Sequence, residues 1–100
     1  MAGAHILQSG VMAKITVKKR GEQSYEVTVE AGSTTSHDVS LTDDYYQKLT
    51  AGRVTPEILI EKSFRFLLAR ESNTMILSRF DLPLIGRYFP EYERTIGGML

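Results

Sequence analysis

Ser36, His37 and Asp38 are the three side-chain types of a serine-hydrolase triad, and here they are consecutive. A working triad needs its three groups to converge within hydrogen-bonding distance. In an extended segment, however, successive side chains point to opposite faces, so the imidazole points away from both of its neighbours. We therefore predict that His37 is an ordinary strand histidine without a catalytic role.

Other groups that could carry out chemistry are few. The chain has no cysteine and only two histidines, which lie far apart, so it lacks thiolate nucleophiles, disulfides and cysteine-held zinc. The acidic pairs Asp43/Asp44 and Glu91/Glu93 lack the spacing of three or four residues that puts two carboxylates on one helical face. No phosphate-binding or dinucleotide-binding glycine pattern occurs. We expect a non-enzymatic protein with no catalytic residue, metal, cofactor or small-molecule ligand.

The composition is typical of a small globular domain. One hundred residues, 42% hydrophobic and 24% charged, suit one domain with a single core. Twelve Lys and Arg balance twelve Asp and Glu, and a formal net charge of zero weakens attraction to polyanions and favours self-association. No stretch approaches the roughly 18 apolar residues of a membrane span. We expect a cytoplasmic protein without a membrane partner.

Two segments near the N-terminus alternate between apolar and polar residues, which predicts half-buried strands over 14–18 and 24–30, joined by a polar turn at Gly21. Placing Lys18 opposite Glu26 gives a register in which both faces agree. It pairs Lys14 with Glu30, Ile15 with Val29, Thr16 with Thr28, Val17 with Val27 and Lys18 with Glu26. The charges of this hairpin are then paired with one another on a solvated face.

The middle of the chain predicts one more strand and two helices. A loop at 32–36 precedes a short strand at 37–41, and Thr42 can cap a short helix over 43–50. Thr55, Pro56 and Glu57 form a strong helix start, and that helix continues to about Glu71. Its apolar residues cover more than half of its circumference. The helix must therefore be covered on two sides, by the sheet and by the chain that follows.

The segment FDLPLIGRYFPEY, residues 80–92, holds four of the nine aromatic residues. We expect short helices over 74–80 and from Leu82 onward, with a break at Phe89 because Pro90 disfavours helical geometry in the residue before it. These helices would close the core over the long helix. Two tyrosines, Tyr88 and Tyr92, would keep their hydroxyls at the solvated edge.

Together these patterns predict one α+β domain over residues 12–100. Its fold is a three-stranded antiparallel sheet, a meander, packed on one long helix with short C-terminal helices. Residues 1–11 are expected to form a flexible N-terminal tail, and Met12 is an alternative start of the chain.

Three functions of different kinds remain open, and the third, after the two below, is an enzyme whose pocket the sequence does not reveal. The first is a protein-interaction or self-association module, in which Arg79, Arg87, Tyr88 and Tyr92 contact the partner, because arginine and tyrosine are enriched at protein interfaces. The alternative is a nucleic-acid-binding regulator with a segment like a helix-turn-helix at 74–89. Equal numbers of acids and arginines around that segment, and two prolines within the supposed recognition helix, argue against the alternative.

Residues 54–93 also carry a resemblance. A family of small bacterial domains of unassigned activity is similar to two stretches of this segment, VTPEILIEKSFRFLLARE and ILSRFDLPLIGRYFPEYE. The domains of that family end in the same FDL and RYFPEYE motifs. The resemblance covers under half of the chain. It implies a bacterial, cytosolic origin and a structural role for the segment, and it transfers no activity, ligand or catalytic residue.

Overall fold

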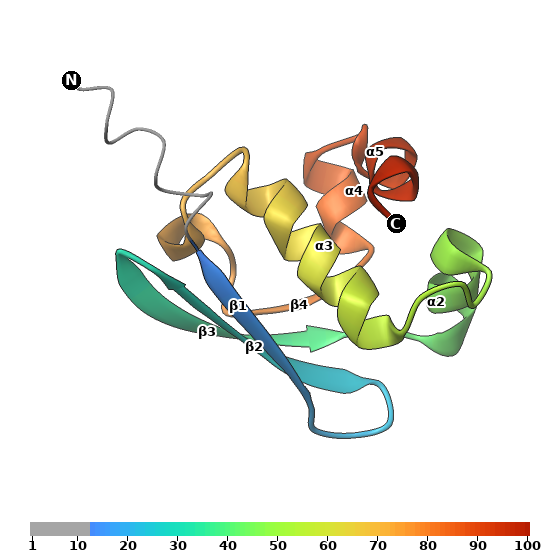
Figure 1. Ribbon diagram of the computed structural model, residues 1–100, viewed down its shortest axis with the longest axis horizontal. Helices are drawn as coiled ribbons and strands as arrows, with labels where there is room; N and C mark the ends of the chain where they lie inside the picture. Colours follow the sequence, from blue (N-terminus) through green and yellow to red (C-terminus); the bar gives the residue numbers. More distant parts are fainter. Residues whose placement is uncertain (1–12) are drawn as a thin grey trace.

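A computed structural model describes residues 13–100, so the predictions for the tail at 1–11 and for Met12 lie outside the described residues. The sheet has the strand order β1-β2-β3-β4, and β1, β2 and β3 are antiparallel neighbours while β4 runs parallel to β3. The helices lie mainly on one face of this sheet (Figure 1). The elements are β1 (Lys14–Lys19), β2 (Ser24–Ala31), β3 (Ser33–Ser40), α2 (Asp43–Thr50), α3 (Pro56–Leu68), the 3-10 turn η1 (Asn73–Met75), β4 (Arg79–Asp81), α4 (Leu84–Tyr88) and α5 (Tyr92–Met99).

The predicted α+β class is confirmed, and so is the register of the first hairpin. All five predicted pairs occur, from Lys14 opposite Glu30 to Lys18 opposite Glu26. Val27 and Val29 are fully buried beneath the helices, because the alternation puts both on the core side of β2. The apolar alternation of two short strands, together with their opposite charges, therefore predicted the pairing.

The third strand is longer than predicted. Residues 33–36, expected in a loop, form the first half of β3 and pair with the end of β2. Only Gly32 separates the two strands, and its φ of 80° is the left-handed conformation that glycine adopts at little cost. The run of serine and threonine has no apolar alternation to reveal a strand, and it is held by the backbone ladder to β2.

Both predicted helix starts are confirmed. The Thr42 side chain accepts a hydrogen bond from the Tyr45 amide, and the Thr55 side chain accepts one from the Ile58 amide. Pro56 follows Thr55 as the first helical residue, where the missing N–H of proline is not needed. The long helix ends at Leu68, a few residues before the predicted Glu71.

The long helix α3 is covered on two sides, as its wide apolar arc predicts. On the sheet side, the Phe64 ring lies 5.4 Å from the His37 ring and 6.0 Å from that of Phe80 in β4. On the other side, the Phe66 ring lies 5.2 Å from the Tyr92 ring. The helix thus joins the sheet layer to the C-terminal helices, and the core extends through both contacts.

The fourth strand corrects the prediction of a purely antiparallel meander and of a helix over 74–80. After η1 the chain becomes extended, and its backbone bonds to β3 instead of to itself: the Asp38 amide donates to the Ser78 carbonyl at 2.8 Å. Asn73 fixes the start of this path, because its side-chain amide donates to the Ser33 carbonyl and to the Thr35 hydroxyl. Tertiary hydrogen bonds outweigh a weak local helix preference here.

The same finding corrects the expectation of a helix-turn-helix-like pair at 74–89. Within that range the structure has a 3-10 turn, a three-residue strand and the five-residue α4. The described residues 74–89 therefore contain no pair of helices that could place a recognition helix in a DNA groove. The predicted helix break at Phe89, by contrast, is present between α4 and α5.

Within residues 13–100, none of the helices combines the length and the apolar character that crossing a membrane requires.

Candidate interaction groove

A mainly apolar groove of about 430 Å³ lies beside the C-terminal end of α3. Its sides come from the end of α3, from the segment that follows η1, from β4 and from α4. We call it the α3–α4 groove. Its lining residues are Leu67, Glu71, Met75, Ile76, Leu77, Phe80, Leu84, Ile85, Tyr88 and Phe89.

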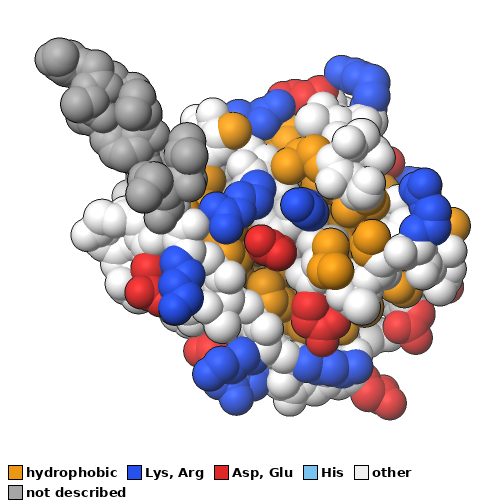
Figure 2. All heavy atoms as spheres, viewed as in Figure 1, with side chains coloured by type: hydrophobic (Ala, Val, Ile, Leu, Met, Phe, Trp, Pro, Cys, Tyr) orange, Lys and Arg blue, Asp and Glu red, His pale blue; other side chains and the backbone are white. Residues whose placement is uncertain are grey.

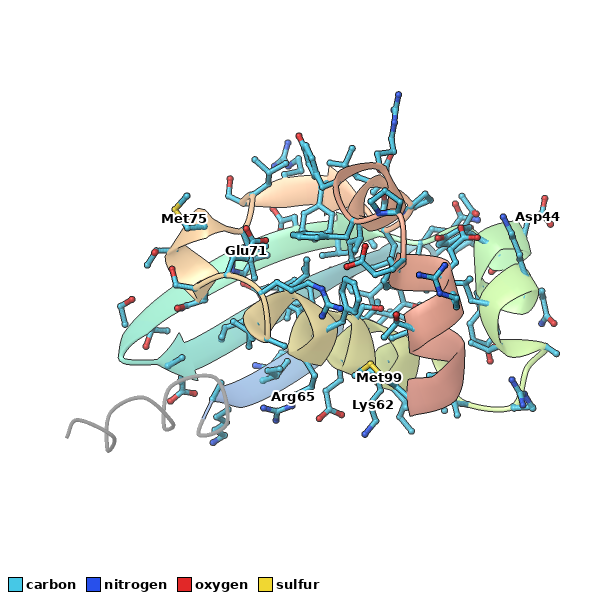
Figure 3. All side chains as sticks on the ribbon, turned by 90° about the horizontal axis from the view of Figure 1, so that it is seen from above. Asp44, Lys62, Arg65, Glu71, Met75 and Met99 are labelled. Atoms are coloured by element: carbon cyan, nitrogen blue, oxygen red, sulfur yellow. The ribbon has the colours of Figure 1, made fainter. Side chains whose placement is uncertain are left out.

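The groove has two opposing walls. The segment around η1 lies on one side of the end of α3, and α4 lies on the other (Figures 1 and 3). In Figure 3, Met75 projects from the η1 side and Glu71 lies at the end of α3, whereas Lys62 and Arg65 lie on the opposite side of that helix. The groove therefore opens away from the charged side of α3.

Hydrogen bonds from β3 hold the η1 wall in place. His37 is buried, and its Nδ1 lies 2.7 Å from the Leu77 carbonyl, which can only accept. In the neutral ring, Nε2 then accepts from the Thr35 hydroxyl at 2.8 Å. The same hydroxyl oxygen accepts from the Asn73 side-chain amide at 2.9 Å. This network fixes the backbone from Asn73 to Leu77, and with it the position of Met75.

The α4 wall is held by aromatic packing. The Phe89 ring meets the Phe66 ring edge-on at 5.8 Å. The guanidinium group of Arg70 lies over the Phe66 ring, with its carbon 3.6 Å from the ring centroid. Arg70 also forms an ion pair with Glu91 at 3.2 Å. The pKa of Glu91 is lowered, first by a hydrogen bond that its carboxylate accepts from the Glu91 backbone amide and second by the bond from Arg70. The wall is thus fixed at the junction of α3, α4 and α5.

The groove gathers most of the large apolar side chains that are highly exposed among the described residues. The described residues contain four large apolar side chains with high exposure, and three of them line this groove: Met75 at 70%, Tyr88 at 65% and Leu77 at 47%. The fourth, Ile58, is 40% exposed at the start of α3. Exposed apolar residues grouped around a hollow mark interaction sites more often than scattered ones do.

The predicted contact residues are only partly brought together. Tyr88 lines the groove, and Arg87 is exposed beside it in α4. Arg79 is also exposed, but it lies at the edge strand β4, where it pairs with Asp38 at 3.5 Å on the sheet face. Tyr88 and Arg87 therefore belong to one surface, and Arg79 belongs to a different one.

Tyr92 requires a correction, because it is not at the solvated edge. Its side chain is 0% exposed, and its hydroxyl lies 2.6 Å from the Ser63 hydroxyl inside the core. Burial is the main reason that the pKa of Tyr92 is raised above its ordinary value. Tyr92 connects α5 to α3 and offers no surface to a partner.

The Ser36–His37–Asp38 sequence behaves as predicted. The Ser36 hydroxyl donates to Glu26 at 3.2 Å on the open face of the sheet, while the His37 ring points into the core. Asp38 faces Arg79 on the open face. The three side chains do not converge, so they form no triad.

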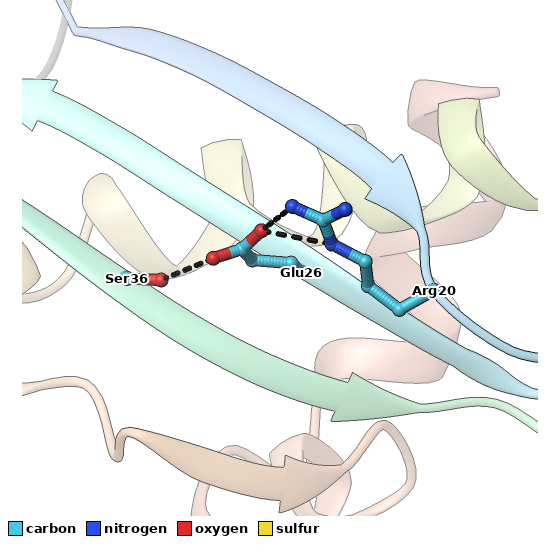
Figure 4. Close-up of polar contacts among 3 residues, drawn as sticks. All are labelled: Arg20, Glu26 and Ser36. Atoms are coloured by element: carbon cyan, nitrogen blue, oxygen red, sulfur yellow. Dashed lines mark hydrogen bonds and ion pairs between the residues drawn. The ribbon is translucent and has the colours of Figure 1, made fainter.

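The open face of the sheet is polar, and its ion pairs among the described residues join Arg20 to Glu26 and Arg79 to Asp38. The cross-strand register aligns Lys18, Glu26, Asp38 and Arg79 in one row across all four strands. Glu26 accepts from Arg20 Nε at 3.0 Å and from Ser36, and the first of these bonds is the main cause of its lowered pKa (Figure 4). A second hollow of about 360 Å³ lies at the β4 end of this face, with Arg20, Asp38 and Asp81 among its lining residues.

The second hollow is lined by charged groups, among them Arg20, Asp38, Arg79 and Asp81, whereas most residues of the α3–α4 groove are apolar. Among residues 13–100, no three His, Cys, Asp or Glu side chains gather closely enough to hold a metal ion. The titratable groups that line the α3–α4 groove are Glu71 and Tyr88, and they come from different walls. Figure 2 shows a further face, over α3 and α5, on which positive and negative side chains are interspersed between apolar patches. That face has no continuous positive surface of the kind nucleic acids require.

Comparisons with models of protein families, with curated proteins and with solved structures give no match to this chain. The resemblance of residues 54–93 to small bacterial domains therefore stays a prediction, as do the bacterial origin and the structural role that it implies.

Sequence reasoning missed Met75 and Leu77, which were placed inside a helix. A signal was present, because Met75, Ile76 and Leu77 are three consecutive apolar residues in a polar setting. In an extended segment only one face can point inward, so such a run must expose part of its apolar surface. Ile76 is buried, and its two neighbours are exposed.

Proposed function

We propose that this protein is a non-enzymatic interaction module of the cytoplasm that binds a protein through the α3–α4 groove. The observation that supports the proposal is the grouping of Met75, Leu77 and Tyr88, which keep apolar surface in water around one hollow. Leaving that surface exposed is unfavourable by about 25 cal/mol for each Å². A partner that covers the groove would recover this free energy.

The composition of the groove suits a protein partner. Methionine and tyrosine, which line the groove, are enriched at protein interfaces, and so is arginine, here Arg87, which is exposed next to Tyr88. Methionine also adapts its shape to the surface that it contacts. The groove walls are held by the His37 network and by the Phe66–Phe89 contact, so a partner would meet a preformed site.

Site-specific photocrosslinking tests the proposal. A benzophenone amino acid at position 88 should form adducts with a protein, either in a bacterial lysate or in the purified sample at high concentration. The matched control carries the same group at Ile58, which is also an exposed apolar side chain but lies outside the groove. Adducts at both positions or at neither would contradict a role for the groove.

A further inference from the structure

We infer that the partner in the α3–α4 groove is a second copy of this chain, related to the first by a twofold axis. This inference rests on the proposed function and names the partner of that same groove. In a twofold interface the same patch serves both copies, so the patch must be complementary to itself in shape and in charge. The groove meets both requirements.

The shape is self-complementary because the surface has both a hollow and projections. The hollow of about 430 Å³ is lined mainly by apolar side chains, and two of these, Met75 of η1 and Tyr88 of α4, keep most of their surface exposed. When two such surfaces face each other, the projecting side chains of each copy can enter the hollow of the other. Neither copy then needs a new segment or a rearranged fold.

The charges are complementary in the same way. Glu71 lines the groove at the end of α3, and Arg87 is exposed in α4 next to the lining residue Tyr88. Within residues 13–100, neither side chain takes part in an ion pair. A twofold axis through the groove brings Glu71 of each copy toward Arg87 of the other, which makes two identical pairs. A formal net charge of zero removes the long-range repulsion between two copies.

The other surfaces are less suited to a second copy. Among the described residues β1 is an edge strand, and antiparallel pairing with its own copy over the full length of the strand would place Lys14 opposite Lys19. Such like-charge pairs protect an edge strand against association. The other edge, β4, is three residues long, and on the open sheet face Glu26 and Asp38 already pair with Arg20 and Arg79 within one copy.

The size of the groove sets the expected strength. Ten residues line it, whereas a standard interface uses about 20 to 30 residues from each partner. We expect a reversible dimer with a dissociation constant on the order of 10 to 100 µM, at the weak end of specific association.

A charge-swap cycle measured by sedimentation equilibrium tests the inference. Glu71→Arg and Arg87→Glu should each raise the dissociation constant about tenfold or more, because each places like charges together in the interface. The double variant should return to within about threefold of the wild type, because its pairs are restored with reversed sign. Glu22→Arg and Arg94→Glu make the same changes at exposed positions outside the groove, and they should leave the constant unchanged.

Thermal unfolding of each variant shows whether it is folded, and Tyr88→Glu provides a second test in which the dimer should be lost. A dimer that these substitutions leave intact, or single swaps that the double swap does not rescue, would overturn the twofold arrangement. A protein that stays monomeric while position 88 crosslinks to a different protein would overturn the dimer but leave the proposed function standing. A monomer without crosslinks at position 88 would overturn both.

Discussion

The buried contact between Ser63 and Tyr92 gives a double-mutant prediction whose size follows from the geometry. The Ser63 hydroxyl donates its one hydrogen to the Leu59 carbonyl at 2.8 Å. The Tyr92 hydroxyl, 2.6 Å away, must therefore donate to Ser63. Both side chains are 0% exposed, so no water can replace either partner. This bond connects α5, the helix that covers the apolar side of α3, to the middle of α3.

The two single substitutions should differ because they leave different groups without a partner. Ser63→Ala removes the acceptor and leaves the Tyr92 hydroxyl as a buried unpaired donor, which should lower the free energy of unfolding by about 1 to 3 kcal/mol. Tyr92→Phe removes the donor and leaves Ser63 bonded to Leu59, at a cost of about 1 kcal/mol. When Tyr92→Phe is already present, adding Ser63→Ala should lower the free energy of unfolding little further, because alanine favours the helix over serine by about 0.5 kcal/mol.

The assay is urea unfolding of the wild type, both single variants and the double variant at neutral pH, with unchanged m-values as the sign that compactness is preserved. The predicted coupling between the two sites is about 1 kcal/mol or more. Tyr88→Phe, a matched change at an exposed tyrosine, should stay within about 0.5 kcal/mol of the wild type. Single effects that add to within about 0.3 kcal/mol would refute the buried hydrogen bond and the close packing of α5 on α3.

Three further predictions concern stability. Burial raises the pKa of Tyr92 in the folded protein. The stability that the neutral tyrosine contributes is therefore complete below its ordinary pKa of about 10 and is lost as pH rises toward the higher folded pKa. Tyr92→Phe should flatten the fall in melting temperature above about pH 10, and an unchanged slope would contradict this. Asn73→Ala removes both bonds to β3 and should cost about 1 to 3 kcal/mol in urea unfolding, whereas a loss below about 0.5 kcal/mol would show that η1 is held by other contacts. Deletion of residues 1–11 should change the melting temperature by no more than a few degrees, and a larger drop would contradict their assignment as a tail.

Local patterns predicted the parts of the fold that depend on periodicity. The alternation in β1 and β2 defined both the strands and their register, because a shift of one residue would have placed Val27 and Val29 in water. The wide apolar arc of α3 indicated that the C-terminal segment must cover it, and Tyr92 and Ile96 do so from α5. In both cases the pattern of apolar residues alone contained the answer.

The parts that could not be predicted depend on contacts between distant residues. The strand β4 has only three residues, and its backbone partner in β3 lies about 40 positions earlier in the chain, so no local pattern reveals it. The same applies to the α3–α4 groove, because the His37–Leu77 hydrogen bond that holds one of its walls joins residues far apart in the sequence. A tyrosine such as Tyr92 suits an interface as well as the core. It is buried because the Ser63 hydroxyl gives its own hydroxyl a hydrogen-bonding partner inside the core, a contact that the sequence does not reveal.

The most direct test of the groove as the surface of association is a dilution series of NMR spectra from about 500 µM to about 10 µM, which brackets the expected dissociation constant. We predict concentration-dependent shifts at the methyl groups of Met75 and Leu77 and at the Tyr88 ring, with the Ile58 methyl groups unchanged as an internal control. Shifts confined to β1, the open sheet face or Ile58 would contradict the account, as would spectra that do not change with concentration at any groove residue.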